Sequence, residues 1–112
     1  MNVIIFGPPG AGKGTQALNI VKKFKLYQIS TGDLLRNEVK NKTSIGKDIE
    51  NIISKGDFAT DEIVNELIKN AIFNPNNKNK LIFDGYPRSL TQAKNLDLLL
   101  MNSSQKIDFI FF

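Results

Sequence analysis

Residues 3–15 read VIIFGPPGAGKGT, an apolar run followed by a loop rich in glycine and proline. The apolar run predicts a buried strand, and the segment after the loop predicts a helix. Glycines let consecutive backbone N–H groups turn toward one point, where the N-terminus of the helix adds a partial positive charge. Lys13 adds a full charge that can reach the β and γ phosphates of a nucleotide. The stretch therefore predicts a binding site for a polyphosphate.

The loop follows the phosphate-binding pattern G-x-x-x-x-G-K-[ST] with one departure. Gly7, Gly12 and Lys13 stand at the required positions. Gly14 occupies the place of the hydroxyl residue that binds the metal, and the hydroxyl follows one residue later at Thr15. An ordinary turn between a strand and a helix is the alternative interpretation. The order of strand, glycines, lysine and helix favours the phosphate site.

The composition restricts the chemistry that the chain can perform. Its 112 residues are enough for one small domain with one core, and they include no cysteine and no histidine. A disulfide framework, a thiolate metal site and the commonest general base are therefore excluded. Carboxylates, lysine, arginine and backbone groups remain, which suits phosphoryl transfer because that reaction depends on positioning and charge neutralisation.

The formal net charge of +4 favours anionic ligands such as nucleotides. Nucleic acid is a less favoured partner, because the lysines are scattered and no aromatic residues are interleaved among them. The sequence begins its first strand at once, without a visible signal peptide, and contains no apolar run of membrane-spanning length. We therefore expect a cytoplasmic protein.

The apolar pattern predicts strands that alternate with helices. The expected strands cover residues 2–6, 26–29, 81–84 and 107–112. The expected helices cover residues 13–24, 30–40, 45–55, 60–73 and 89–101. Because the strands are apolar on both faces, they predict a parallel sheet covered by helices on both sides, a three-layer α/β fold.

Smaller signals refine the predicted elements. Thr60 is a candidate N-cap, and Ser89 with Gln92 has the spacing of a capping box. Gly46 is expected to interrupt a helical stretch near its start. The segment from residue 30 to residue 60 has helices but no strand, so it is expected to stand off the sheet as a small insertion. The final apolar strand, ending at Phe112, leads us to expect the N-terminal part of a longer protein.

Asp84 closes a predicted strand, and the carboxyl end of a parallel strand is where such sheets bind ligands. Beside a phosphate loop, this carboxylate is placed to hold Mg²⁺ directly or through water. A carboxylate that merely caps the following turn is the alternative.

Two arginines follow strand ends and predict a second anion site. Arg88 lies shortly after Asp84, and Arg36 lies one helical turn after Asp33. Two guanidinium groups beside one crevice can clamp a phosphate through forked hydrogen bonds. A surface salt bridge is the alternative for each arginine alone.

Taken together, the motifs resemble those of the adenylate kinase family, the nucleoside monophosphate kinases of the P-loop class. The motifs are GPPGAGKGTQ at 7–16, STGDLLR at 30–36, TDEIV at 60–64 and DGYPR at 84–88, with Gln92 beyond them. The resemblance implies a P-loop core at 1–29 and 60–112, and a helical insertion that binds the nucleoside monophosphate at 30–59. It also implies that the mobile lid and the last core strand lie beyond Phe112.

The resemblance also implies roles for individual residues. The ATP phosphates would be held by Gly10, Ala11, Gly12, Lys13, Gly14 and Thr15. The AMP site would consist of Thr31, Arg36, Asp57, Phe58, Ala59, Gly85, Tyr86, Pro87, Arg88 and Gln92. The catalytic residues would be Lys13, Arg36, Asp84 and Arg88, with Asp84 in the shell of the Mg²⁺ cofactor. Tyr86 stands where the family more often has Phe.

The implied reaction is ATP + AMP ⇌ 2 ADP, performed by a full-length monomer. For the chain as given we expect little or no turnover, because the lid and its arginines are missing. A kinase for another monophosphate, UMP or CMP, stays open, although Thr31 favours AMP because those relatives commonly have Ala there. A nucleotide-binding module without catalysis is the other alternative.

Overall fold

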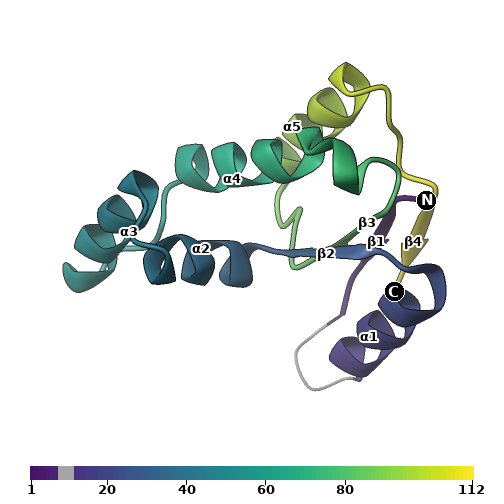
Figure 1. Cartoon of the computed structure of the whole chain (residues 1–112), viewed down its shortest axis with the longest axis horizontal. Coiled ribbons are helices and arrows are strands. Elements are labelled where there is room, and N and C mark those ends of the chain that lie inside the picture. The colour runs from purple at the N-terminus through teal and green to yellow at the C-terminus, as the bar shows by residue number, and fades with distance from the viewer. Residues whose placement is uncertain (8–11) are drawn as a thin grey trace.

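The computed structural model describes residues 1–7 and 12–112. The predicted roles of Gly10 and Ala11 therefore lie outside the described residues. Within the described part, the strands β1 (Val3–Ile5), β2 (Tyr27–Ser30), β3 (Leu81–Asp84) and β4 (Phe109–Phe111) form one parallel sheet in the order β2-β3-β1-β4 (Figure 1). The predicted parallel sheet is confirmed.

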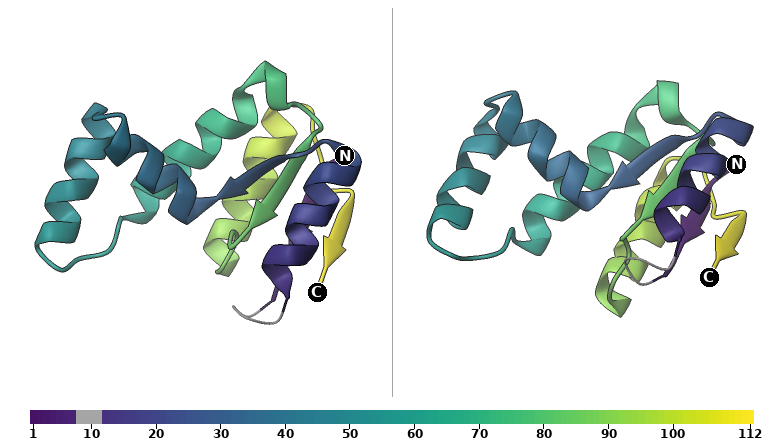
Figure 2. Two further views of the ribbon diagram at one scale, coloured as in Figure 1. Left: turned by 60° about the horizontal axis from the view of Figure 1, so that its bottom comes forward. Right: turned by 90° about the horizontal axis from the view of Figure 1, so that it is seen from below.

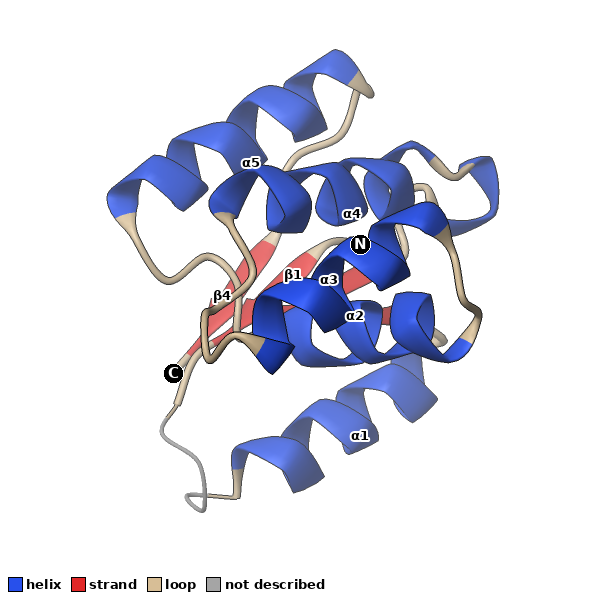
Figure 3. Ribbon diagram, turned by 90° about the vertical axis from the view of Figure 1, so that its left-hand side faces the viewer, coloured by secondary structure: helices blue, strands red, loops and turns tan. Residues whose placement is uncertain are grey.

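Helices cover the sheet on both faces. Figure 3 shows the strands between α1 (Lys13–Phe24) on one side and α4 (Asp61–Phe73) with α5 (Leu90–Asn102) on the other. Alternate residues of a strand point to opposite faces, so β1 and β3 each contribute to two separate cores. One core joins Val3, Ile5 and Ile82 with Ala17 of α1. The other joins Ile4, Leu81 and Phe83 with Ile68 of α4 and Leu96 of α5.

The helices α2 (Thr31–Lys40) and α3 (Ser44–Ser54) extend to one side of the sheet, as both views of Figure 2 show. Gly46 lies inside α3, where an added Cβ would overlap the carbonyl oxygen of Glu38 in α2. The expectation that Gly46 interrupts the helix is therefore wrong. Glycine is needed at position 46 because the two helices approach each other closely there. Thr43 is the N-cap of α3, and its side-chain oxygen accepts a hydrogen bond from the N–H of Gly46. The role assigned to this helical pair stays a prediction.

Asn2 is a fully buried polar residue at the start of β1. Its side chain donates to Gln105 Oε1 at 3.1 Å and to the carbonyl oxygen of Lys106 at 3.0 Å. Its Oδ1 accepts a hydrogen bond from the N–H of Leu81 at 3.2 Å. The buried amide is fully paired, and it joins β1 to the start of β3 and to the segment that leads into β4.

A short 3₁₀ helix, η1 (Pro75–Asn77), lies in the polar stretch before β3.

β4 pairs with β1 at the edge of the sheet, and its side chains are 41–53% exposed. Its parallel pairing agrees with the sequence, whereas the burial expected for an apolar strand is not observed, because its side chains belong to neither of the two cores. Phe6 and Phe112 stack beside it with ring centroids 5.6 Å apart. None of the described helices is long and apolar enough to cross a membrane.

Candidate functional site

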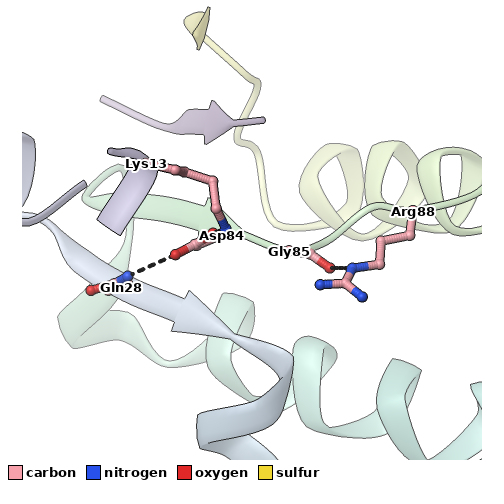
Figure 4. A network of polar contacts seen from close by, with 5 residues as sticks. All are labelled: Lys13, Gln28, Asp84, Gly85 and Arg88. Atoms are coloured by element: carbon pink, nitrogen blue, oxygen red, sulfur yellow. Dashed lines mark hydrogen bonds and ion pairs between the residues drawn. The ribbon is translucent and has the colours of Figure 1, made fainter. Parts of the chain in front are cut away.

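The carboxyl ends of three strands meet around Asp84. This residue ends β3, pairs in register with Ile5 of β1 on one side, and pairs with Ser30 of β2 on the other. Its carboxylate forms an ion pair with Lys13, the first residue of α1, through Oδ1. Its Oδ2 accepts a hydrogen bond from Gln28 Nε2 at 3.2 Å (Figure 4). The lysine of the glycine-rich loop and the predicted strand-end carboxylate are thus in direct contact.

Lys13 begins α1 because Gly12 supports the turn into the helix. Gly12 has φ 80°, a left-handed conformation that glycine adopts without a Cβ clash. Its carbonyl oxygen accepts the first helical hydrogen bond from Gln16 at 3.0 Å. The N–H groups of the first turn of a helix, here including those of Gly14 and Thr15, have no partner within the helix and can bind an anion. The side chains of Lys13 and Asp84 are only 19% and 15% exposed, so their charges interact with little screening by solvent.

Arg88 is held in place by the turn that follows β3. Its Nε donates to the carbonyl oxygen of Gly85 at 2.8 Å, so the guanidinium lies against that glycine. Gly85 has φ +80°, and an added Cβ would lie 3.2 Å from a terminal nitrogen of Arg88. The positive φ of the turn therefore favours glycine, and the guanidinium packs closely against it. Ser89 and Gln92 cap α5, and Gln92 Oε1 accepts from the backbone N–H of Arg88 at 2.7 Å.

Lys13 and Arg88 line the same open cavity of about 690 Å³. Gly85 and Pro87 contribute to its wall from one side, and Phe6 contributes from the end of β1. The cavity opens at the carboxyl ends of the parallel strands, where α/β sheets bind their ligands. Two cations on one cavity, one of them paired with a carboxylate, suit a ligand that carries more than one phosphate group.

Arg36 lies elsewhere. Its guanidinium is paired with Asp33 in the same helix, and its side chain is 72% exposed. It lines a separate hollow of about 300 Å³ between α2 and α3, together with Leu35 and Ile53. The two arginines that the sequence predicts beside one crevice thus line two different hollows.

The remaining predicted AMP-site residues lie around α2 and after α3. Thr31 begins α2 and lies with Leu35 and Val64 between α2 and α4, where the space left is too small for a water molecule. Asp57, Phe58 and Ala59 form the segment between α3 and α4, where the Phe58 side chain is 92% exposed.

Tyr86 points into the core instead of into the cavity. Its ring is only 1% exposed, and its hydroxyl lies among Asn65 of α4, the carbonyl oxygen of Gln92 and Asn95 of α5. Burial raises the pKa of Tyr86, the charge of Asp61 raises it further, and the hydrogen bond from Asn95 opposes both effects. Only the backbone of Tyr86 is therefore available to a ligand in the cavity.

Gln28 is the site residue that the sequence reasoning missed. A polar side chain in β2, two positions before the end of the strand, was the available signal. Its contact with Asp84 depends on β2 and β3 being neighbours in the sheet, and strand order is not readable from spacing alone.

The residues around Asp84 fit a hydrated magnesium ion. Across residues 1–7 and 12–112, no group of three or more His, Cys, Asp or Glu side chains is placed to hold a metal. Mg²⁺ in nucleotide sites is commonly bound by one or two carboxylates together with water and substrate phosphates. Both oxygens of Asp84 already have partners, which suits contact through water.

Comparison with known proteins gives one consistent family. The sequence profile described as adenylate kinase matches residues 5–112. The adenylate kinase of Pelagibacter ubique is 55% identical over all of this chain and 53% of its own length. The adenylate kinases of Mycoplasma mycoides and Thermosipho africanus are 44% and 38% identical, again over the whole chain and over 52% of their own lengths. The chain thus spans about half the length of the curated relatives it matches, and it belongs to the adenylate kinase family.

Proposed function

We propose that this chain carries the donor site and the acceptor site of a kinase that transfers the γ-phosphoryl group of ATP to AMP. One observation supports this reaction above the others, namely that Lys13 and Arg88 line a single cavity at the carboxyl ends of the strands. Lys13 would face the donor triphosphate, together with Gly12, Gly14, Thr15 and the loop residues Gly10 and Ala11. Arg88 would face the phosphate of the acceptor.

The proposed transfer is an in-line displacement that needs no strong base, because the acceptor phosphate is already an anion at neutral pH. Lys13 would move from Asp84 to the phosphates and neutralise the charge that develops between donor and leaving group. Arg88 would orient the acceptor, since a planar guanidinium can bind two phosphate oxygens at once. Reactions of this kind depend on positioned charges, and this chain contains no histidine.

Arg36 and Thr31 would complete the acceptor site from α2. Because Arg36 lines a different hollow from Arg88, its proposed contact with the acceptor phosphate requires α2 to approach the cavity. Its pairing with Asp33 is exposed and therefore easily exchanged for a phosphate. The AMP molecule is proposed to be surrounded by the segment 57–59, Gly85, Pro87, Gln92 and the backbone of Tyr86.

Magnesium is the proposed cofactor, with Asp84 holding the ion through water. When bound, the ion would neutralise charge on the donor phosphates. We further propose a monomeric cytoplasmic enzyme that acts on these two nucleotides and does not bind nucleic acid. Turnover by the 112-residue chain itself is expected to be slow, because it spans only about half the length of its relatives.

Separate titration of the 112-residue chain with ATP and with AMP tests the proposal. Backbone NMR signals of Lys13 and its neighbours should respond to ATP, and those of the 85–88 turn and α2 should respond to AMP. Lys13→Met should weaken ATP binding about tenfold or more, because a charged contact is lost, and should leave AMP binding unchanged. Lys22→Met, near the other end of α1, is the matched control.

Three outcomes would count against the reaction. Binding of ATP without any response to AMP would favour a nucleotide-binding module. Equal or better competition by UMP or CMP would favour a kinase for another monophosphate. If ATP and AMP displaced each other completely, a single shared site would replace the two proposed here.

A further inference from the structure

The Asp84 carboxylate is held by two elements from two directions. Lys13 of α1 contacts Oδ1, and Gln28 of β2 donates from Nε2 to Oδ2 at 3.2 Å (Figure 4). In the register of the two strands, Ser30 is the partner of Asp84 and Gln28 is the partner of Ile82. Gln28 and Ser30 are two residues apart, so their side chains lie on the same face of the sheet. Gln28 therefore reaches Asp84 diagonally from the neighbouring strand.

The two partners of Asp84 have different chemistry. Lys13 carries a charge that a triphosphate can attract away, whereas the side-chain amide of Gln28 is neutral and has no attraction for a metal through its donor group. When Lys13 moves to a phosphate, the hydrogen bond from Gln28 is the contact that can keep the carboxylate in its orientation. A carboxylate held at one oxygen presents the other oxygen in a fixed direction.

We propose that Gln28 is a positioning residue of the donor site. It would hold Oδ2 of Asp84 so that Oδ1 faces Lys13 in the free chain and faces the hydrated cation when the donor nucleotide is bound. This inference rests on the proposed function, because it assigns Asp84 to the binding of magnesium–ATP. Gln28 itself would not touch the nucleotide. It would act through Asp84 alone.

Burial by itself does not require this hydrogen bond. Gln28 is only partly buried, and the Asp84 side chain is 15% exposed, so water has access to the carboxylate. A carboxylate that water can reach is not left unsatisfied when one protein donor is removed. The hydrogen bond therefore contributes orientation more than stability, and its loss should be visible in ligand binding before it is visible in folding.

Gln28→Met tests the inference, because methionine has a similar length and shape but no donor. The dissociation constant of the 112-residue chain is measured for ATP with excess Mg²⁺ and for ATP with EDTA. Gln28→Met should weaken magnesium–ATP binding about tenfold, the lower end of the range for a hydrogen bond to a charged group, because this contact is partly exposed. Binding of ATP without magnesium should change less than about twofold, within the scatter expected for a surface substitution.

Three comparisons make the result specific. Gln28→Glu, which places a second carboxylate beside Asp84, should weaken magnesium–ATP binding more than Gln28→Met does. Tyr27→Phe, an exposed neighbour on the same strand, should match the parent chain. In a chain that already carries Asp84→Asn, Gln28→Met should have almost no further effect, because both substitutions remove the same function.

The inference is overturned if Gln28→Met binds magnesium–ATP as the parent does, or if it weakens ATP binding equally with and without magnesium. It is also overturned if Gln28→Met and Asp84→Asn have independent, additive effects. Absence of ATP binding by the parent chain would instead contradict the proposed function, and the inference with it. The two failures are therefore distinguishable in one set of titrations.

Discussion

The parallel sheet and the helical pair α2–α3 differ greatly in how deeply their side chains are buried. Val3, Ile82 and Phe83 in the central strands are completely inaccessible to solvent. In contrast, α2 has no fully buried residue, and α3 has only Gly46 and Ile49. Segments with little buried apolar surface open locally at a lower free energy than the core does. The molecule therefore combines a firm sheet with a helical pair that is easier to displace.

This difference separates the proposed site residues into two groups. Asp84 ends β3, Arg88 lies in the turn that follows it, and Lys13 begins α1 in contact with Asp84, so their contacts are already formed. Arg36 and Thr31 belong to α2, and Arg36 is exposed to solvent. Lys13, Asp84 and Arg88 are thus held in place before any ligand binds, whereas the contribution of α2 to the proposed acceptor site depends on a segment that is easier to displace.

The largest effect should come from the core of the sheet. Phe83→Ala removes a fully buried ring at the centre of the larger core and should lower the free energy of unfolding by about 3–5 kcal/mol. Urea denaturation measures the loss, and the sheet and the helices should unfold together. Phe58→Ala, at a side chain that is 92% exposed, is the control and should change stability by less than about 0.5 kcal/mol. A loss below about 1 kcal/mol for Phe83→Ala would contradict the burial of the ring.

A smaller and more local effect is expected in the helical pair. Gly46→Ala forces a Cβ against the backbone of Glu38, so α2 and α3 must separate at a cost of about 1–3 kcal/mol. Amide hydrogen exchange should accelerate across residues 31–54, while β1 and β3 keep their protection. Lys47→Ala, the exposed neighbour of Gly46 in α3, should leave exchange unchanged. Equal acceleration in the sheet would show that the two regions open as one unit.

The stability of the core should depend on pH through Tyr86, which is buried there. The pKa of Tyr86 is raised above its ordinary value of 10.0, mainly by burial. Below that value Tyr86 is protonated in both the folded and the unfolded chain, and its contribution to stability is complete. As the pH rises further, the unfolded tyrosine ionises first, so the free energy of unfolding falls until the folded pKa is passed.

Chemical denaturation of the parent chain and of Tyr86→Phe, between neutral pH and about pH 11, isolates this effect. Lysines titrate in the same range in both proteins, and their contribution cancels in the difference. The stability advantage of the parent over Tyr86→Phe should shrink above pH 10.0. A constant difference across this range would mean that the hydroxyl is solvated in the folded chain.

The smallest effect on stability is expected at Arg36. Arg36→Met removes an exposed pairing with Asp33 and should change the free energy of unfolding by less than about 0.5 kcal/mol. The same substitution should weaken AMP binding measurably, because the proposed acceptor contact is lost. Thermal unfolding and AMP titration of one sample give both values. A large loss of stability would show that Arg36 supports the fold of α2 and is not free for a ligand.

The order of elements and several helix caps could be predicted from the sequence because they depend on neighbouring residues. Thr60 accepts from the N–H of Ile63 at 3.3 Å, as its cap position predicts. Ser89 Oγ accepts a hydrogen bond from the N–H of Gln92 at 3.1 Å, as the capping box predicts. The Gln92 side chain, however, accepts from the N–H of Arg88 and not from that of Ser89. The proximity of Lys13 and Asp84 could also be predicted, because the loop and the strand end are expected at the same edge of a parallel sheet.

Other features depend on the arrangement of distant segments. The contact of Gln28 with Asp84 and the burial of Asn2 follow from the strand order β2-β3-β1-β4, which is not the order of the chain. The need for glycine at position 46 arises from the backbone of another helix. The separation of Arg36 from Arg88 depends on how far α2 extends from the sheet, and no local pattern encodes that distance.

The hydrogen bond between Asn2 and Gln105 joins residues that are 103 positions apart in the chain. During synthesis on the ribosome, β1 emerges early but cannot acquire its second neighbour until β4 follows. One edge of β1 therefore stays open until residues 109–111 have been synthesised, and in that time it can pair with other nascent chains. Contacts of such long range also slow folding, because a large loop must close before they form. In this fold, β1, the strand that leads into the glycine-rich loop, gains its second neighbour only when β4 has formed.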